Sequence, residues 1–293
     1  MYILMFNAPK REKLAPEKKI LMIVTRFAPS PTGRLHIGHA FAARFAFEEA
    51  KKAGGKFLLR IEDIDPIRCK PEFVDGIMED LDWLGLKWDE QPIRQSERMD
   101  FYAEALEKLK RLDVLYPCVC TRKEIESEIA RMGHAPHAGE TAVYPGTCRG
   151  KHLDLSRYDR WSWRLDVAKS LAITGDSLCF TDESRGTVRA NPAIFGDIVL
   201  ARKETPASYH LCSVLDDAAQ GVTLVTRGED LFDSTHIHRL LQELLGLRTP
   251  LYKHHRLISD ENGQRLAKRN QAVTIKSLRE KGLNPAEIFA LCK

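Results

Sequence analysis

The segment APSPTGRLHIGHA, residues 28–40, separates two runs of different periodicity. The apolar run at 20–27 predicts a buried strand, and the amphipathic run that follows the segment predicts a helix over 37–53. A Gly-Gly pair and a second apolar run at 56–61 complete a strand–helix–strand unit with short connections. Such a unit favours a parallel sheet, so we expect an α/β fold.

Further regular elements are predicted downstream. Helical stretches are expected near 71–84 and 97–112. The run GVTLVTRGEDL predicts a strand, a turn and a helix start, and THIHRLLQELLG predicts a helix that Gly246 ends. The polar, glycine-containing run DENGQRLAKRNQAVTI predicts a loop. Cysteines, prolines and glycines gather between about 115 and 190, as an inserted subdomain would show.

The composition limits the class of protein. Hydrophobic residues make up 43% and charged residues 29% of the 293 residues, as in ordinary globular proteins. No apolar run approaches the roughly 18 residues that span a membrane, so we expect no membrane partner. The seven cysteines are odd in number and no export signal precedes them, which predicts a reducing, cytoplasmic setting. A net charge of +4 permits a polyanionic partner without requiring one.

His36 and His39 lie where the first strand turns into the first helix. Backbone N–H groups and the helix dipole make this end of an open α/β sheet a phosphate site. Residues three apart share one helix face, so both imidazoles can point at the same phosphate. Gly38 removes a side chain and lets a flat base lie against the backbone. The alternative for a bare H-x-x-H pattern is a pair of surface histidines.

Longer motifs favour the nucleotide site. RFAPSPTGRLHIGH resembles the first signature of the class I aminoacyl-tRNA synthetases, in the form carried by the glutamyl and glutaminyl group. LRIEDID, residues 59–65, resembles the family's RIEDTD block, with Ile64 where threonine is usual, and residues 208–235 are similar to its amino-acid pocket stretch. RLAKR, residues 265–269, resembles the second signature, with arginine and alanine in place of a lysine and a serine. These landmarks extend from Thr25 to about Ile275.

The resemblance implies the residues that bind ATP, which is used together with Mg²⁺. The expected ATP-binding and catalytic residues are His36, Gly38, His39 and Lys268. Lys268 is the lysine that the second signature places on the ATP phosphates. Its loop has the polar character of a clamp that closes over nucleotide. Taken alone, RLAKR would be a solvated basic turn.

Charge chemistry predicts an acidic substrate, because Arg26 and Arg227 end two predicted strands and a guanidinium pairs with a carboxylate through two parallel hydrogen bonds. The resemblance implies that Glu62 receives the α-ammonium of glutamate and that the arginines with Tyr209 hold its carboxylates. The full set of implied glutamate-binding residues is Arg26, Ala28, Ser30, Glu62, Tyr209 and Arg227. The alternative for each residue alone is a surface ion pair worth under about 1 kcal/mol.

A second cluster is formed by Cys118, Cys120, Tyr144 and Cys148. Three thiolates and one oxygen could make a closed four-coordinate zinc site, one per chain, that staples the insertion. Tyrosine is the weakest of these ligands, and His134, His137 and His152 are rival donors. A short branch of the synthetase family has the same C-x-C and Y-x-x-x-C pattern, which favours zinc.

The chain ends soon after Lys268, so we expect no anticodon-binding domain. The short form and the cysteine pattern resemble the branch that activates glutamate without tRNA and attaches it to the queuosine base of tRNA(Asp). The expected partners are ATP, L-glutamate and queuosine-containing tRNA(Asp), and the expected state is a monomer. Three alternatives remain: a truncated enzyme that charges tRNA(Glu), an inactive RNA-binding paralogue, and a different nucleotidyltransferase.

The expected architecture is a Rossmann-type nucleotide-binding domain with a parallel sheet, an inserted zinc-containing subdomain and a short C-terminal helical segment. The expected boundaries are an N-terminal extension over 1–19, the first half of the Rossmann domain over 20–114, the insertion over 115–190, the second half over 191–250 and the C-terminal segment over 251–293.

Overall fold

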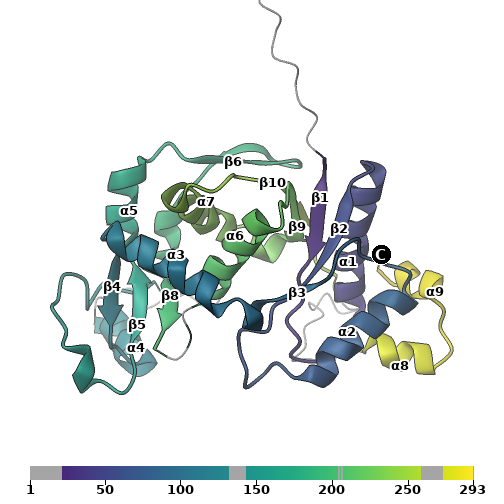
Figure 1. Cartoon of the computed structure of the whole chain (residues 1–293), viewed down its shortest axis with the longest axis horizontal. Coiled ribbons are helices and arrows are strands. Elements are labelled where there is room, and N and C mark those ends of the chain that lie inside the picture. The colour runs from purple at the N-terminus through teal and green to yellow at the C-terminus, as the bar shows by residue number, and fades with distance from the viewer. Residues whose placement is uncertain (1–21, 132–142, 204, 206, 259–272, 293) are drawn as a thin grey trace, which may run out of the picture.

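The computed structural model describes residues 22–131, 143–203, 205, 207–258 and 273–292. Helices flank three hydrogen-bonded sheets within these residues (Figure 1). The described part of the chain contains no helix that is long and apolar enough to cross a bilayer.

The first sheet confirms the predicted strand–helix–strand unit. Strand β1 (Val24–Phe27) pairs in parallel with β2 (Lys56–Ile61), and β2 pairs in parallel with β3 (Ile93–Arg94). Helix α1 (Ile37–Lys52) connects β1 to β2. Its buried residues are four alanines, whose small side chains let the helix pack closely on the sheet.

A second sheet continues this layer. Its order is β7 (Gly186–Arg189), β6 (Cys179–Asp182), β10 (Leu251–His255) and β9 (Leu224–Gly228), with β10 parallel to both of its neighbours. The Thr223 N–H donates to the Val24 carbonyl oxygen at 3.0 Å, so β9 lies beside β1. Strand β2 therefore lies on one side of β1, and β9 lies on the other side. This arrangement creates a switch point at the carboxyl ends of β1 and β9, where open α/β sheets bind ligands.

The third sheet is antiparallel and lies at the lower left of Figure 1. It contains β4 (Leu115–Cys118), β5 (Ser162–Leu165) and β8 (Val199–Arg202), and α4 (Arg122–Arg131) follows β4. β6 and β7 also lie within the range expected for the insertion, but β6 pairs with β10, and β7 pairs with β6. The boundaries of the insertion stay a prediction.

The predicted helices are confirmed within a few residues. They are α1, α2 (Pro71–Trp83), α3 (Met99–Arg111) and α7 (Ser234–Leu245), and Gly246 ends α7 in the left-handed conformation. The remaining helices are α5 (Val167–Thr174), α6 (Tyr209–Ala219), α8 (Ile275–Glu280) and α9 (Pro285–Ala290), with 3₁₀ turns at Gln95–Glu97, Leu155–Arg157, Pro192–Phe195 and Glu229–Leu231.

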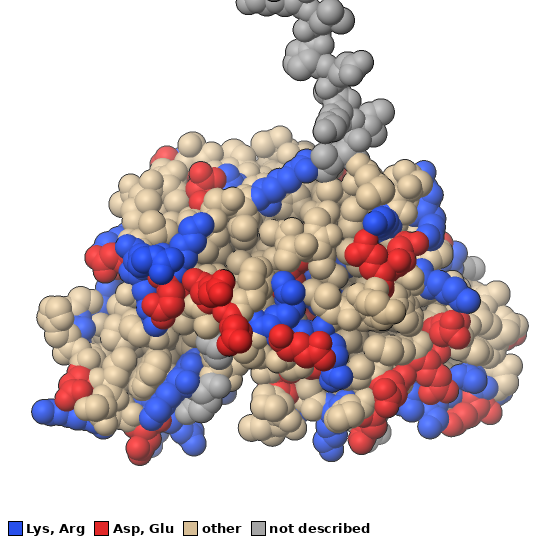
Figure 2. Space-filling view, in the orientation of Figure 1, with Lys and Arg blue, Asp and Glu red and all other residues tan. Residues whose placement is uncertain are grey.

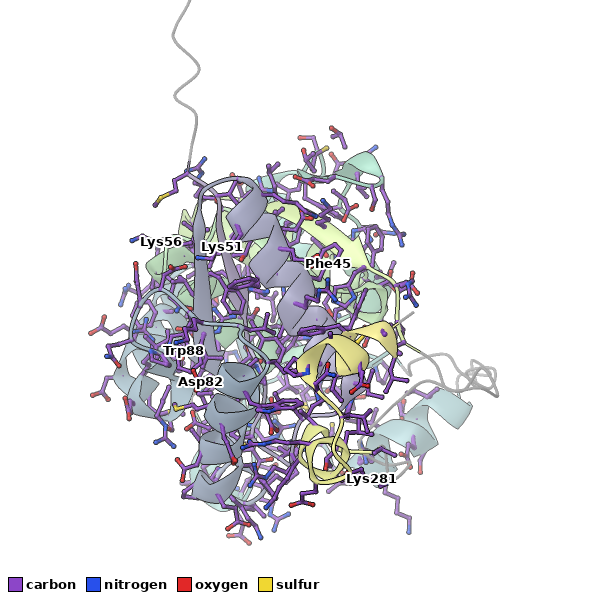
Figure 3. All side chains as sticks on the ribbon, turned by 90° about the vertical axis from the view of Figure 1, so that its right-hand side faces the viewer. Phe45, Lys51, Lys56, Asp82, Trp88 and Lys281 are labelled. Carbon is purple, nitrogen blue, oxygen red and sulfur yellow. The ribbon has the colours of Figure 1, made fainter. Side chains whose placement is uncertain are left out.

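The C-terminal helices pack against the first sheet's helices. Figure 3 shows α8 and α9 beside α1, with Phe45 of α1 on the same side of the molecule. Ile275, Leu278 and Ile288 of these helices share one buried core with α1 and α2. Beyond α9, the Cys292 thiol donates to the Ile37 carbonyl oxygen at 3.8 Å, in the first turn of α1. The described end of the chain therefore contacts the start of α1.

Candidate active site and metal centre

The histidine turn is the first turn of α1. His36 is the N-cap residue and His39 is the third helical residue. The Gly38 N–H donates to His36 Nδ1 at 3.1 Å, and the His36 N–H donates to His39 Nδ1 at 3.2 Å. The two rings lie 3.7 Å apart between centroids, so one helix turn presents both imidazoles together, as predicted.

These bonds determine where each imidazole keeps its proton. A ring nitrogen that accepts a hydrogen bond cannot be protonated, so each neutral ring has its proton on Nε2. The backbone N–H groups of Gly38 and His39 are engaged within the turn, with His36 Nδ1 and the His36 carbonyl oxygen. These two backbone N–H groups are therefore not available to a phosphate, in contrast to the expectation for this helix start.

Gly38 has a second role that the sequence did not indicate. A Cβ atom at this position would lie 3.0 Å from His36 Cε1 and 3.1 Å from its Nδ1. Any side chain would therefore displace the first imidazole. Thr274, the first residue before α8, forms an isolated antiparallel bridge with His36, which fixes the other side of the turn. Lys268, the fourth expected ATP-binding residue, lies outside the described residues.

Arg227 is the second-last residue of β9, close to the predicted strand end at the switch point, and only 6% of it is exposed. Its Nε donates to His254 Nε2 at 3.1 Å, and its Nη2 donates to the Thr235 hydroxyl at 2.6 Å. Its Nη1 lies 3.4 Å from the Tyr209 hydroxyl and 3.2 Å from His238 Nδ1. All four partners are neutral groups, and no described carboxylate forms an ion pair with Arg227. A buried cation surrounded in this way favours an anionic ligand.

The neutral state of the histidines has a physical cause. Burial, together with the charge of Arg227, lowers the pKa of His254 to about 4, although Asp182 opposes the shift. The pKa of His238 is lowered well below its usual value by burial and by Arg227. His254 Nδ1 lies 2.6 Å from Asp182 Oδ2, so Asp182 fixes the proton on Nδ1 and leaves Nε2 to accept from Arg227.

Arg26, at the end of β1, is paired with a carboxylate. Its Nε and Nη2 donate to Asp217 at 2.8 and 3.4 Å, and its Nη1 donates to the Thr226 carbonyl oxygen at 2.9 Å. Arg60 is fully buried and also donates to Asp217, at 2.7 Å, and to Glu62, at 3.3 Å. Two guanidinium groups and two carboxylates therefore form one compact, balanced cluster that joins β1, β2 and α6.

Ionisation within this cluster is uneven. Burial raises the pKa of Glu62, and the opposing charges of Arg60 and Arg26 do not fully offset this effect. Burial acts in the same direction on Asp217, but Arg26 and Arg60 outweigh it and lower the pKa of that carboxyl. Glu62 is consequently the carboxylate that gains most from an additional cation, as an α-ammonium group would supply.

Ala28 and Ser30 lie on the loop that follows β1. Between them, the Pro29 carbonyl oxygen accepts from the Glu62 N–H at 3.0 Å, so this loop runs beside the end of β2. Ala28 is partly buried and Ser30 is exposed. The structure thus brings these two residues to the neighbourhood of Glu62.

The four predicted metal ligands come together. The Sγ atoms of Cys118, Cys120 and Cys148 all lie within 4.8 Å of one another. The Tyr144 hydroxyl lies 3.3 Å from Cys118 Sγ and 3.5 Å from Cys120 Sγ. Three sulfur atoms and one oxygen fit the donor set of a structural zinc ion. Of the rival donors, His152 is exposed and outside this cluster, and His134 and His137 lie outside the described residues.

Sequence reasoning missed several residues around the predicted site. Arg60 is a charged residue within the otherwise apolar strand KFLLRI, which signals a buried ion pair. No comparable signal marks Asp217, Thr235 or His238. Each lies in a segment whose pattern indicates a buried face but does not indicate a partner for the polar side chain. His254 lies within β10, whose sequence LYKHH contains three polar residues and does not indicate that this histidine is buried.

Comparisons with known proteins agree with these motifs. The model of the catalytic domain of class I tRNA synthetases of the E and Q type matches residues 22–293. A glutamyl-Q tRNA(Asp) synthetase of Rhodobacter capsulatus is 48% identical over 275 residues, which are 92% of this chain and 99% of that protein. A glutamate–tRNA ligase of Aquifex aeolicus is 39% identical over 91% of this chain, but the match spans 56% of the ligase.

The fold has a solved counterpart. A glutamate–tRNA ligase of Elizabethkingia meningosepticum, crystallised with its amino acid, superposes with a TM-score of 0.66 at 29% identity. The superposition covers 85% of this chain and 52% of that one.

Proposed function

We propose, from the premise that this chain belongs to the class I tRNA synthetases of the glutamyl and glutaminyl type, that it activates glutamate with ATP and transfers it to the queuosine base of tRNA(Asp). The identity of 48% with a protein of that activity, over nearly the full length of both, supports the acceptor. The observation that most supports an acidic substrate is the Arg227 guanidinium, which is buried and has no described carboxylate as its partner.

The first step forms the adenylate. A carboxylate oxygen of glutamate attacks the α-phosphorus of ATP, and pyrophosphate leaves. The Nε2–H groups of His36 and His39 donate to oxygens of the phosphoryl group as negative charge develops there. Gly38 keeps the first ring in place, and we assign Lys268 to the same phosphates. Mg²⁺ carried with ATP would neutralise charge on the leaving pyrophosphate.

The amino-acid site is assigned to both sides of the switch point. Arg227, with Tyr209, binds a carboxylate of glutamate, and Glu62 receives the α-ammonium. Arg26 keeps one N–H on Nη1 and one on Nη2 beyond those already engaged, and these can reach the substrate. Ala28 and Ser30 form the wall of the loop beside Glu62.

The second step transfers the acyl group. A hydroxyl of the modified base attacks the activated carbonyl carbon, the bond to phosphate breaks, and AMP leaves with the electron pair. Because the acceptor hydroxyl belongs to a base of the anticodon loop, the enzyme must bind single-stranded nucleotides beside the amino-acid site. We assign the protein to the cytoplasm, the compartment expected from its seven cysteines and its tRNA substrate.

We further assign a structural zinc ion to Cys118, Cys120, Tyr144 and Cys148. Zinc at this site would crosslink β4 to the segment that holds Tyr144 and Cys148, within the predicted insertion over 115–190. Metal analysis of the purified protein tests this assignment. We expect one zinc ion per chain and its loss in Cys118→Ser, while Cys179→Ser, at an exposed cysteine outside the cluster, retains it.

Two assays test the reaction. Glutamate-dependent exchange between ATP and pyrophosphate in the absence of RNA should be detectable, and its absence would end the proposal that this chain activates glutamate without RNA. Glutamate should then be transferred to tRNA(Asp) that contains queuosine and not to the unmodified transcript. Charging of tRNA(Glu) would instead establish the alternative of a short tRNA-charging synthetase.

A further inference from the structure

A pocket of about 880 Å³ lies next to the cysteine cluster. Its walls come from α4, β5 and β8, at the lower left of Figure 1, and Cys120 and Tyr144 form part of its lining. Figure 2 shows a notch in the outline of the molecule between this lobe and α2. The volume is within the range of pockets that enclose a ligand of nucleotide size.

The pocket carries an excess of positive charge. Arg122, Arg160 and Arg202 line it and are exposed, and none forms an ion pair with a described carboxylate. Two acidic residues also line it, Glu126 and Asp197, and Asp197 is already neutralised by Arg149 Nε at 2.8 Å. Many other arginines of the described chain are ion-paired, so this group of uncompensated guanidinium groups requires an explanation.

A fourth arginine supports the same conclusion. Arg164 lines the pocket, although only 8% of it is exposed. Its Nη1 donates to the Asp197 carbonyl oxygen at 2.7 Å, and its guanidinium lies over the Tyr144 ring at 3.7 Å. Its Nε has no hydrogen-bond partner among the described residues. The guanidinium also interacts with the Cys118 sulfur, so the cysteine cluster partly compensates this cation. The three exposed arginines therefore carry most of the positive charge of the pocket.

The opposite wall adjoins the amino-acid site. His210 lines the pocket, and its Nδ1 lies 3.2 Å from His238 Nε2. His238 Nδ1 in turn lies 3.2 Å from Arg227 Nη1. Two imidazole rings therefore separate the pocket from the guanidinium that we assign to glutamate, and Tyr209 precedes His210 in the chain.

We propose that this pocket binds the phosphodiester backbone of the nucleotides that flank the acceptor base in the single-stranded anticodon loop. The inference rests on the proposed function, because it takes the acceptor to be a base of such a loop. When the acceptor base enters the amino-acid site, the phosphates on either side of that nucleotide must lie close to the site. Guanidinium groups bind phosphates through bidentate hydrogen bonds, and the aromatic rings of the lining offer stacking surfaces.

The double variant Arg160→Gln with Arg202→Gln tests the proposal, with both single variants alongside. Arg157→Gln is the matched control, because Arg157 is exposed on the same segment but is paired with Asp154 and does not line the pocket. Exchange between ATP and pyrophosphate measures activation alone. Transfer to queuosine-containing tRNA(Asp), measured at several salt concentrations, gives the apparent KM for RNA.

We expect unchanged exchange in all variants and an apparent KM for tRNA raised by about tenfold or more in the double variant. Its salt dependence should weaken by about 0.7 in the log–log slope for each RNA phosphate that the variant no longer neutralises. Equal KM values and slopes for the double variant and Arg157→Gln would overturn the proposal while leaving the proposed function intact. A raised KM for ATP in the exchange assay would assign the pocket to the nucleotide and also overturn it. Failure of the unaltered protein to modify tRNA(Asp) would instead remove the proposed function, and this inference with it.

Discussion

At the scale of single residues, Arg227 differs from every other arginine of the switch point. Arg26 and Arg60 share Asp217, whereas Arg227 is surrounded by hydroxyl and imidazole groups. A buried charge without a counter-ion costs several kcal/mol, and this cost is removed when a carboxylate binds. The site is therefore prepared for an anion before the substrate arrives.

Replacement of this arginine should weaken glutamate binding more than catalysis. In Arg227→Gln the cationic partner of the substrate carboxylate is lost, so we expect the KM for glutamate in the exchange assay to rise by about a hundredfold or more. Arg227→Lys should restore little, because an ammonium group cannot reproduce the planar fork. Arg189→Gln, at an exposed arginine far along the sheet, is the control. An unchanged KM in Arg227→Gln would contradict the assignment.

Gly38→Ala tests the close approach of the His36 ring to the Gly38 backbone. The added methyl group would lie 3.0 Å from His36 Cε1, so the ring must move away from its partner. We expect kcat of the exchange reaction to fall by about tenfold or more, because a donor to the transition state is displaced. Gly85→Ala is the control for a loss of stability. It places a side chain at a positive φ, which strains the backbone, but the added methyl group meets no neighbouring atom. Wild-type kcat in Gly38→Ala would show that the ring tolerates the methyl group.

The residues of the site were only partly predictable. His36, His39 and Arg227 stand in motifs whose spacing indicates their position at strand ends. Asp217 and His238 act through contacts between segments that are distant in sequence, and a single sequence does not specify such contacts. The role of Gly38 as space for the His36 ring likewise depends on a rotamer that no sequence pattern encodes.

At the scale of elements, periodicity located the main helices and parallel strands because each has one continuous apolar face. The bounds of helices α1 and α7 were predicted to within a residue. The histidine turn marks the start of α1, and Gly246 marks the end of α7. The hairpin of β6 and β7, and the pairing of β6 with β10, were not predicted. These strands are short, and β10 lies far along the chain, so local pattern does not determine where they pair.

The pairing of β6 with β10 has a functional consequence. Asp182 ends β6, and His254, on β10, lies between it and Arg227. In Asp182→Asn the amide can no longer act as an ionised acceptor for His254 Nδ1–H, and the ring can rotate or exchange its proton. We expect the KM for glutamate to rise about tenfold with little change in kcat, measured by exchange. Asp176→Asn, at an exposed carboxylate before β6, is the control. A fall in kcat alone would contradict a positioning role.

At the scale of the whole molecule, the buried histidines link folding to pH. Burial, with the charge of Arg227, lowers the pKa of both His210 and His254 to about 4. The unfolded chain binds protons at these groups below about pH 6.5, whereas the folded chain resists them. Their stabilising contribution is therefore complete above pH 6.5 and is lost as the pH falls towards 4.

Thermal or urea unfolding between pH 7.5 and 4.5 measures this effect. We expect the free energy of unfolding to decrease with acidification, by roughly 3 kcal/mol at most for each of these two imidazoles, and by less for His210, which is only partly buried. His210→Gln should flatten the dependence, whereas His152→Gln, at an exposed histidine, should not. A free energy that is constant or rises over this interval would contradict the neutral state of the buried rings.

The contact between Cys292 and Ile37 has a practical consequence for anyone who purifies this protein. The turn that presents both imidazoles is contacted by Cys292, the last described residue. Cys292 is held in turn by the Arg256 guanidinium, which donates to its carbonyl oxygen at 2.7 Å. An affinity tag fused directly after Lys293 would start one residue beyond that contact. Kinetic constants from such a fusion would report on the tag as well as the enzyme.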